Sequence, residues 1–282
     1  MIIYKLKEYV LKAYYKKFKQ VPIPDDKSNL KEIYYNLLDK YEEECLCNIK
    51  FEIIRSLKNG FSFYRYRSVN EYTIDSIKKA KIWFSTPNQY NDPFEFHFKS
   101  GNEELINEIK KVLPEIDLHE VIEYQEQFYE RRELSKKEFA ICCFMENDES
   151  NLMWSHYADY HKGFCIEYDL SKACFFDFLY PVYYTKDVID LPKNYAKVCI
   201  TKSEEWNYEL EWRMIYLGQS GLQDAPPIKS ICLGARFDEK DELSKELLKI
   251  VSERNIPVYK TEISRTSYSL IKKGPLDINY LL

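Results

Sequence analysis

Apolar residues in the first fifth of the chain recur at a helical spacing. Residues 1–20 and residues 28–58 both place apolar side chains three or four positions apart, with charged residues between them. Two prolines between these segments interrupt the spacing, and Gly60 follows its end. The pattern predicts an N-terminal helical appendage over residues 1–59.

The pattern changes after residue 60. Short runs of aromatic and β-branched residues, separated by turn-forming residues, predict strands. These strands are expected at 61–67, 82–86, 139–145, 164–168, 180–185, 211–217, 228–233 and 257–263. Helical spacing returns at 70–81, 150–161 and 239–254, and a charged stretch around 102–138 resembles a helical insertion. Because strands and helices do not alternate regularly, we expect an α+β domain over 60–282, with a mixed, largely antiparallel sheet core flanked by helices.

Composition narrows the class of protein. The seven glycines form neither a G-x-G-x-x-G nor a G-x-x-x-x-G-K motif, which disfavours a Rossmann-type fold and a P-loop NTPase. The net charge of −5 provides no overall positive field for polynucleotides or anionic lipids. Several of the eight cysteines lie in apolar runs, and there is neither a signal-peptide pattern nor an apolar run of about 18 residues. We therefore expect a cytoplasmic protein that does not contact a membrane.

The most informative polar pattern is Glu209-Leu210-Glu211-Trp212-Arg213. Alternation along a strand would put the two glutamates and Arg213 on one face, and the apolar residues on the other. Two carboxylates and a guanidinium would then share one surface, either as a functional site or as a solvated face of an edge strand.

Tyr64-Arg65-Tyr66-Arg67 shows the same alternation, with both arginines on one face and both tyrosines on the other. Guanidinium groups bind phosphate in a bidentate manner and stack on aromatic rings, which makes this pair a candidate anion site. A surface strand with paired charges is the alternative interpretation.

Polar residues also follow the strand expected at 82–86. Ser85 and Thr86 lie at its end, where binding sites are commonly built, and a turn comes next. The alternative is that 91–93 merely forms a tight turn. Further candidates in and after this turn are Tyr90, Asn91, Asp92 and Glu95.

His156 and Tyr157 are candidates on the helix expected at 150–161. The second histidine of this helix, His161, lies five positions after His156, whereas the H-E-x-x-H zinc motif needs a spacing of four. A zinc site made by this pair is therefore disfavoured.

Five segments, in the order in which they occur along the chain, resemble a bacterial domain family of unknown function, numbered twenty-nine seventy-one. The segments are 64–67, 91–95, 153–157, 162–164 and 209–213. The resemblance covers about residues 61–240, and the family name implies no activity.

The order of a basic strand, a hydroxyl-bearing strand and an E-x-E strand is distantly similar to that of ADP-ribosyltransferases, which bind NAD without a glycine-rich loop. This resemblance implies that Glu211 is the catalytic glutamate and Glu209 the upstream carboxylate. It also implies that Arg65 or Arg67 contacts an NAD phosphate or ribose, and that Phe84, Ser85 and Thr86 support the nicotinamide pocket. The remaining candidates for NAD contact are Tyr90, His156, Tyr157 and Arg213. On this assignment, Glu211→Gln should abolish NAD turnover with little change in melting temperature.

We therefore expect an NAD-consuming enzyme that transfers ADP-ribose or hydrolyses NAD, without a metal, as a bacterial toxin or phage-defence effector. Its acceptor is a macromolecule or water, and the N-terminal helices are a candidate protein-binding segment. Two other classes stay open. One is a non-catalytic binding module built on Tyr, Trp and Arg. The other is a nuclease or phosphoesterase that binds Mg²⁺ or Mn²⁺ through Asp92, Glu95, Glu209 and Glu211.

Overall fold

An eight-stranded mixed sheet forms the centre of the molecule, with the strand order β14-β13-β12-β5-β1-β4-β10-β6. The computed structural model describes residues 19–99, 136–190, 192, 194–218 and 220–278. Every neighbouring pair in this sheet is antiparallel except β12 and β13. The α+β class with a mixed, largely antiparallel sheet and flanking helices is thus confirmed.

The strands of this sheet follow the apolar runs of the sequence. They are β1 (Ser62–Arg67), β4 (Phe139–Met145), β5 (Phe164–Asp169), β6 (Leu179–Pro181), β10 (Glu211–Leu217), β12 (Ile228–Leu233), β13 (Val258–Ile263) and β14 (Leu270–Lys273). Smaller two-stranded sheets pair β2 (Lys81–Phe84) with β11 (Gly221–Asp224), β3 (Phe98–Lys99) with β8 (Ile189–Asp190), and β7 (Tyr183–Thr185) with β9 (Thr201–Ser203). The strand expected at 180–185 is in fact two strands, because the chain leaves the large sheet at Val182 and pairs with β9 instead.

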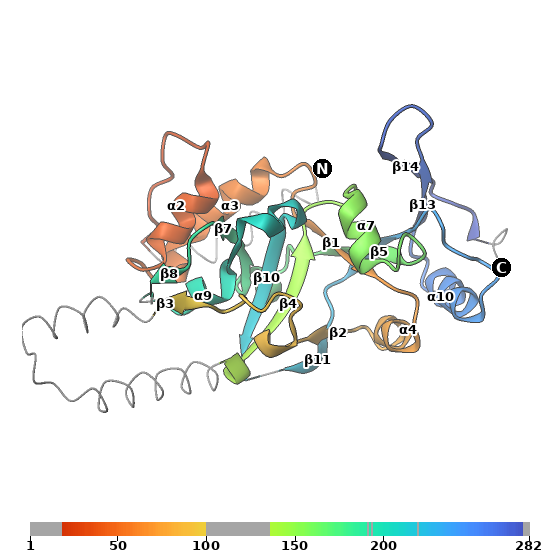
Figure 1. Cartoon of the computed structure of the whole chain (residues 1–282), viewed down its shortest axis with the longest axis horizontal. Helices are drawn as coiled ribbons and strands as arrows, with labels where there is room; N and C mark the ends of the chain where they lie inside the picture. The colour runs from red at the N-terminus through yellow and green to blue at the C-terminus, as the bar shows by residue number, and fades with distance from the viewer. Residues whose placement is uncertain (1–18, 100–135, 191, 193, 219, 279–282) are drawn as a thin grey trace, which may run out of the picture.

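Helices cover the sheet and its ends (Figure 1). They are α2 (Leu30–Leu37), α3 (Cys47–Ser56), α4 (Glu71–Lys78), α7 (Asn151–Tyr157), α8 (Ala173–Phe176), α9 (Ala196–Ile200) and α10 (Glu242–Glu253), with short 3-10 helices η1 (Glu43–Leu46), η2 (Pro87–Gln89), η3 (Lys136–Glu138) and η4 (Glu204–Glu209). The helix expected at 28–58 is divided into α2, η1 and α3. Most of the expected insertion, and residues 1–18 of the appendage, lie outside the described residues. None of the described helices has the length and apolar character needed to cross a membrane.

One hydrophobic cluster joins the N-terminal helices to the sheet. Tyr34 of α2 and Phe51 of α3 belong to the same cluster of buried residues as Phe63 of β1 and Trp212 of β10. The described helices α2 and α3 therefore pack in the core of the sheet domain, and the boundary near residue 60 stays a prediction. A second cluster contains Tyr64 and Tyr66 of β1 with Trp154 of α7, so the expected alternation along β1 is confirmed.

The turn after α7 fixes the end of β1. The helix expected through His161 stops at Tyr157, because residues 159–161 all adopt left-handed φ angles of 44°, 54° and 69°. The chain then passes Gly163, where a Cβ atom would lie 2.1 Å from the carbonyl oxygen of Arg67. Only glycine permits this approach. The loop therefore packs directly on the backbone that carries one of the candidate arginines.

Candidate functional site

A cavity of about 240 Å³ is lined by β1, β4, β10, the turn after β2, and η4; we call it the polar cavity. Every candidate side chain named from the sequence lines it, except Phe84, Thr86 and His156. The segments that the sequence pattern singled out separately thus meet in one place.

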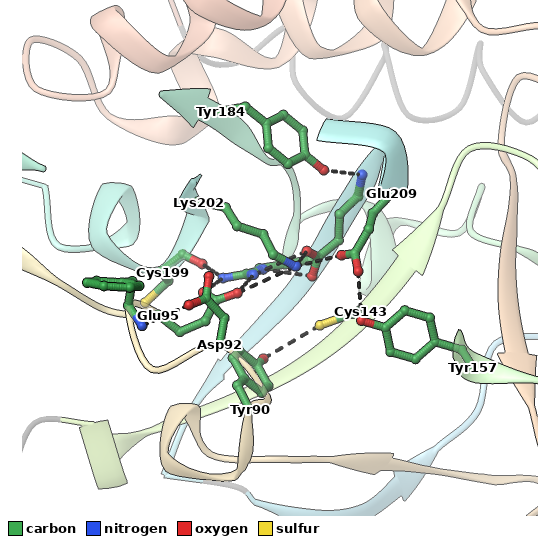
Figure 2. A network of polar contacts seen from close by, with 12 residues as sticks. Tyr90, Asp92, Glu95, Cys143, Tyr157, Tyr184, Cys199, Lys202 and Glu209 are labelled. Carbon is green, nitrogen blue, oxygen red and sulfur yellow. Dashed lines mark hydrogen bonds and ion pairs between the residues drawn. The ribbon is translucent and has the colours of Figure 1, made fainter. Parts of the chain in front are cut away.

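Three glutamates converge on two cations inside this cavity (Figure 2). Lys202 Nζ lies 2.5 Å from Glu209 Oε2, 2.9 Å from Glu211 Oε2 and 3.6 Å from Glu95 Oε1. None of these four side chains is more than 8% exposed. Together with Arg213 they form the five-residue charge cluster, which carries one formal negative charge when all five groups are ionised.

Arg213 holds two of the glutamates in fixed positions. Its two Nη atoms donate to the carboxylate of Glu95 at 2.9 and 2.6 Å, and its Nε donates to Glu211 Oε1 at 2.8 Å. A further bond of 2.6 Å reaches the carbonyl oxygen of Cys199. The backbone N–H of Glu211 donates to Tyr184 Oη at 2.8 Å. A guanidinium bound on several sides in this way is a rigid anchor for Glu211.

The environment separates the pKa values of the two neighbouring glutamates. Burial acts against ionisation of both, but for Glu211 the charges of Arg213 and Lys202 outweigh it and lower the pKa. For Glu209 burial prevails over Lys202, and the pKa is raised. Tyr157 Oη donates to Glu209 Oε1 at 2.7 Å. Glu209 is thus suited to proton exchange, whereas Glu211 is a fixed anion.

The two glutamates share a side for a reason that strand alternation does not supply. Glu209 is the last residue of η4, and β10 begins only at Glu211. Leu210 between them adopts a left-handed conformation with φ of 47°. The expected strand face is therefore corrected: a backbone kink directs both carboxylates toward Lys202, and they are buried rather than solvated.

Arg65 and Arg67 also line the polar cavity. Both are partly buried, and the Arg65 guanidinium lies 5.6 Å from the ring centroid of Phe144. Among the described residues, no carboxylate lies within ion-pair distance of either arginine. The charge of Arg65, together with burial, lowers the pKa of Arg67 to about 10. Two neighbouring guanidinium groups without a protein anion form a receptive site for phosphate.

The turn after β2 has both structural and cavity-lining residues. Asp92 Oδ1 accepts a hydrogen bond of 2.9 Å from the backbone N–H of Phe94, so the tight-turn interpretation holds for Asp92, although its side chain also lines the cavity. This turn leads to the buried Glu95. Thr86 donates its backbone N–H to Gln89 Oε1 at 3.1 Å, and it does not line the polar cavity.

Ser85 and Tyr90 occupy the base of this turn. Ser85 pairs with Ile141 of β4 as an isolated β-bridge and donates from Oγ to the Ile141 carbonyl at 3.4 Å. The Tyr90 ring lies 5.3 Å from the Arg213 guanidinium, and Cys143 Sγ donates to Tyr90 Oη at 3.6 Å. Tyr90 thus supports the charge cluster, while the exposed Asn91 lies at the cavity rim.

His156 lies on the exposed side of α7. Its Nδ1 is 3.3 Å from Tyr208 Oη, and its side chain lines a neighbouring hollow that also includes Tyr157 and Trp206. The next residue, Tyr157, is the one from this helix that reaches the charge cluster. The geometry therefore places His156 outside the polar cavity, although its hollow shares Asn91 and Tyr157 with that cavity.

Lys202 is the central residue that sequence reasoning missed. It lies in β9, where the flanking Thr201 and Ser203 form no recognisable motif, and Lys202 Nζ is 5.0 Å from the ring centroid of Trp206. The one available signal was electrostatic: buried carboxylates at positions 209 and 211 need more compensation than Arg213 alone supplies.

The fold and the site together define an α+β protein with a buried charge cluster beside an unpaired arginine pair. Comparison of the chain with protein-family models, curated proteins and solved structures finds no match in any of the three. The resemblances drawn from the sequence therefore stay predictions. Within the described residues, no group of three or more His, Cys, Asp or Glu side chains is arranged to hold a metal ion.

Proposed function

We propose that the protein is a cytoplasmic NAD-consuming enzyme that transfers ADP-ribose or hydrolyses NAD in the polar cavity. The observation that carries this proposal is the uncompensated pair of Arg65 and Arg67 in the same cavity as the charge cluster. The diphosphate group of a dinucleotide needs cationic side chains that are not already paired with a carboxylate of the protein. Cleavage at the ribose needs carboxylates near the reacting carbon.

The reaction breaks the bond between the nicotinamide nitrogen and ribose C1′, and the electron pair leaves with nicotinamide. The positive charge that develops on the ribose is stabilised by the net negative charge of the cluster, in which Glu211 is held ionised. Water or an acceptor group then bonds to C1′, and its proton passes to Glu209. The raised pKa of Glu209 supports this role, since a general base works best when its pKa lies near the working pH.

The free cysteines support the proposed compartment. All eight are unpaired, as in proteins of reducing compartments. An enzyme that consumes NAD there would deplete the cell of a central cofactor, which is the basis for our proposal of a toxin or phage-defence effector.

The metal-dependent alternative has less support from the geometry. Glu95, Glu209 and Glu211 already direct their oxygens at Lys202 or Arg213. A divalent cation would have to displace these buried charges before it gained oxygen ligands.

The test is calorimetric titration of the full chain with NAD, followed by chromatographic measurement of nicotinamide release. Arg65→Gln should weaken NAD binding, and Glu209→Gln should lower release while NAD still binds. Arg265→Gln, at an exposed arginine outside the polar cavity, is the matched control.

Three outcomes would contradict the proposal in different ways. If NAD does not bind and nicotinamide is not released, the whole proposal is wrong. Binding without release identifies a binding module. Nuclease activity that depends on Mn²⁺ and is lost with EDTA identifies the metal-dependent alternative.

A further inference from the structure

A second cavity, of about 490 Å³, shares Arg65 and Arg67 with the polar cavity; we call it the ring cavity. Its floor includes Ile166 and Tyr168 of β5, the strand paired with β1. Its walls come from α4, β2 and β11. The arginine pair therefore lies between two cavities of different chemistry.

Exposed aromatic and apolar side chains gather in the ring cavity. Trp83 of β2 is 48% exposed and Leu222 of β11 is 45% exposed, and the two residues are direct cross-strand partners. Tyr72 of α4 is 86% exposed and lines the same cavity. Large apolar side chains that line a hollow and remain open to solvent are typical of a surface for a planar ligand.

The charged residues at the ring cavity do not neutralise the arginines. Asp75 is paired with Lys79 at 2.8 Å, and Lys81 is paired with Asp224 at 2.7 Å. Burial raises the pKa of Tyr168 to about 12, so its hydroxyl stays neutral. The positive charge of Arg65 and Arg67 is therefore available to a ligand from this side as well.

We infer that the ring cavity binds the base of a nucleotide, with the nucleotide's phosphate on Arg65 and Arg67. An apolar ligand would leave the guanidinium pair without an anion, and inorganic phosphate would leave the rings of Trp83 and Tyr72 without a partner. A ring system joined to a phosphate satisfies both. The inference deepens the proposed function, and it rests on that function for the position of the nicotinamide end of the dinucleotide. The dinucleotide then spans both cavities, with its nicotinamide ribose at the charge cluster.

The test titrates the full chain with AMP and with inorganic pyrophosphate, which carries the negative charge but no ring. Removing a stacked aromatic side chain weakens nucleotide binding by about tenfold or more. Trp83→Ala should therefore weaken AMP binding by about this factor and change pyrophosphate binding less than about twofold. Trp83→Phe keeps a ring and should restore most of the AMP affinity, and Tyr268→Ala, at a fully exposed tyrosine outside both cavities, is the control.

Leu222→Ala gives a second measurement on the same wall if Trp83→Ala does not fold. AMP binding that is equal in wild type and both wall variants, or that falls in them only as much as pyrophosphate binding does, overturns the inference. If NAD is cleaved but the wall variants bind AMP normally, the inference fails and the proposed function stands. If AMP binds as expected but NAD is not cleaved, the proposed function fails and the base site stands.

Discussion

Replacing Lys202 with methionine tests whether the charge cluster is a single electrostatic unit. Lys202 contacts all three glutamates, and its side chain is 8% exposed. Methionine has a similar length and fills the space without the charge. Two carboxylates, Glu209 and Glu211, lose a partner at 2.5 and 2.9 Å, and only Arg213 remains to compensate three anions.

The expected loss of stability is large and depends on pH. Removing one partner of a buried ion pair costs about 3–5 kcal/mol in the free energy of unfolding. Without Lys202, the pKa of Glu209, which burial already raises, rises further above the unfolded value of about 4.3, and the folded protein takes up a proton that the unfolded chain releases. Arg213 still lowers the pKa of Glu211. Stability of the variant therefore falls as pH rises above that value, by up to about 1.4 kcal/mol per pH unit for each proton.

The assay is urea unfolding of wild type and Lys202→Met at about pH 5 and about pH 7.5. The deficit of the variant should be clearly larger at the higher pH. Lys186→Met is the matched control, because Lys186 is 79% exposed and pairs with Glu204 at 3.5 Å on the surface; its loss should be below about 1 kcal/mol. A Lys202→Met deficit as small as that of the control, or one that does not change with pH, would refute the reasoning.

Three further substitutions test other parts of the site. Gly163→Ala places a Cβ 2.1 Å from the Arg67 carbonyl oxygen. It should lower the free energy of unfolding by about 1–3 kcal/mol in urea titrations, and an unchanged midpoint of unfolding would contradict the close packing. Tyr157→Phe removes the hydrogen bond that lowers the pKa of Glu209, so the acidic limb of the NAD turnover profile should move to higher pH; an unmoved limb would show that Glu209 is not the base. Glu211→Gln leaves Arg213 and Lys202 short of an anion and should cost about 3 kcal/mol in thermal or urea unfolding. This replaces the nearly unchanged melting temperature expected from the sequence for Glu211 as a catalytic residue, and a stability like that of wild type would restore that expectation.

The central strands could be predicted from the sequence because their signals are local. The bounds of β4 and β10 agree with the apolar runs at 139–145 and 211–217. The strands that were missed, such as β3 and β9, are two or three residues long and form only because distant segments pair. No local pattern encodes such a pairing.

The sequence predicted which residues belong to the candidate site more fully than it predicted their chemistry. Side-chain alternation correctly placed Arg65 and Arg67 on one face, because both lie within one regular strand. It gave the wrong reason for the shared side of Glu209 and Glu211, since a single left-handed residue cannot be read from apolar periodicity. Lys202 was missed because its role depends on three glutamates that lie 7 to 107 positions away in the chain.

The left-handed residue between the two glutamates also makes the site adjustable from a position outside the charge cluster. Leucine in this conformation costs about 1–2 kcal/mol, whereas glycine adopts it freely. The contacts of Glu209 and Glu211 with Lys202 must therefore outweigh a local preference of the backbone to straighten. Changing Leu210 to glycine would remove the energetic cost of the left-handed conformation without removing any side chain of the charge cluster. Evolution can thus alter how firmly the two carboxylates are held together through one residue whose side chain belongs to neither the cluster nor the lining of the polar cavity.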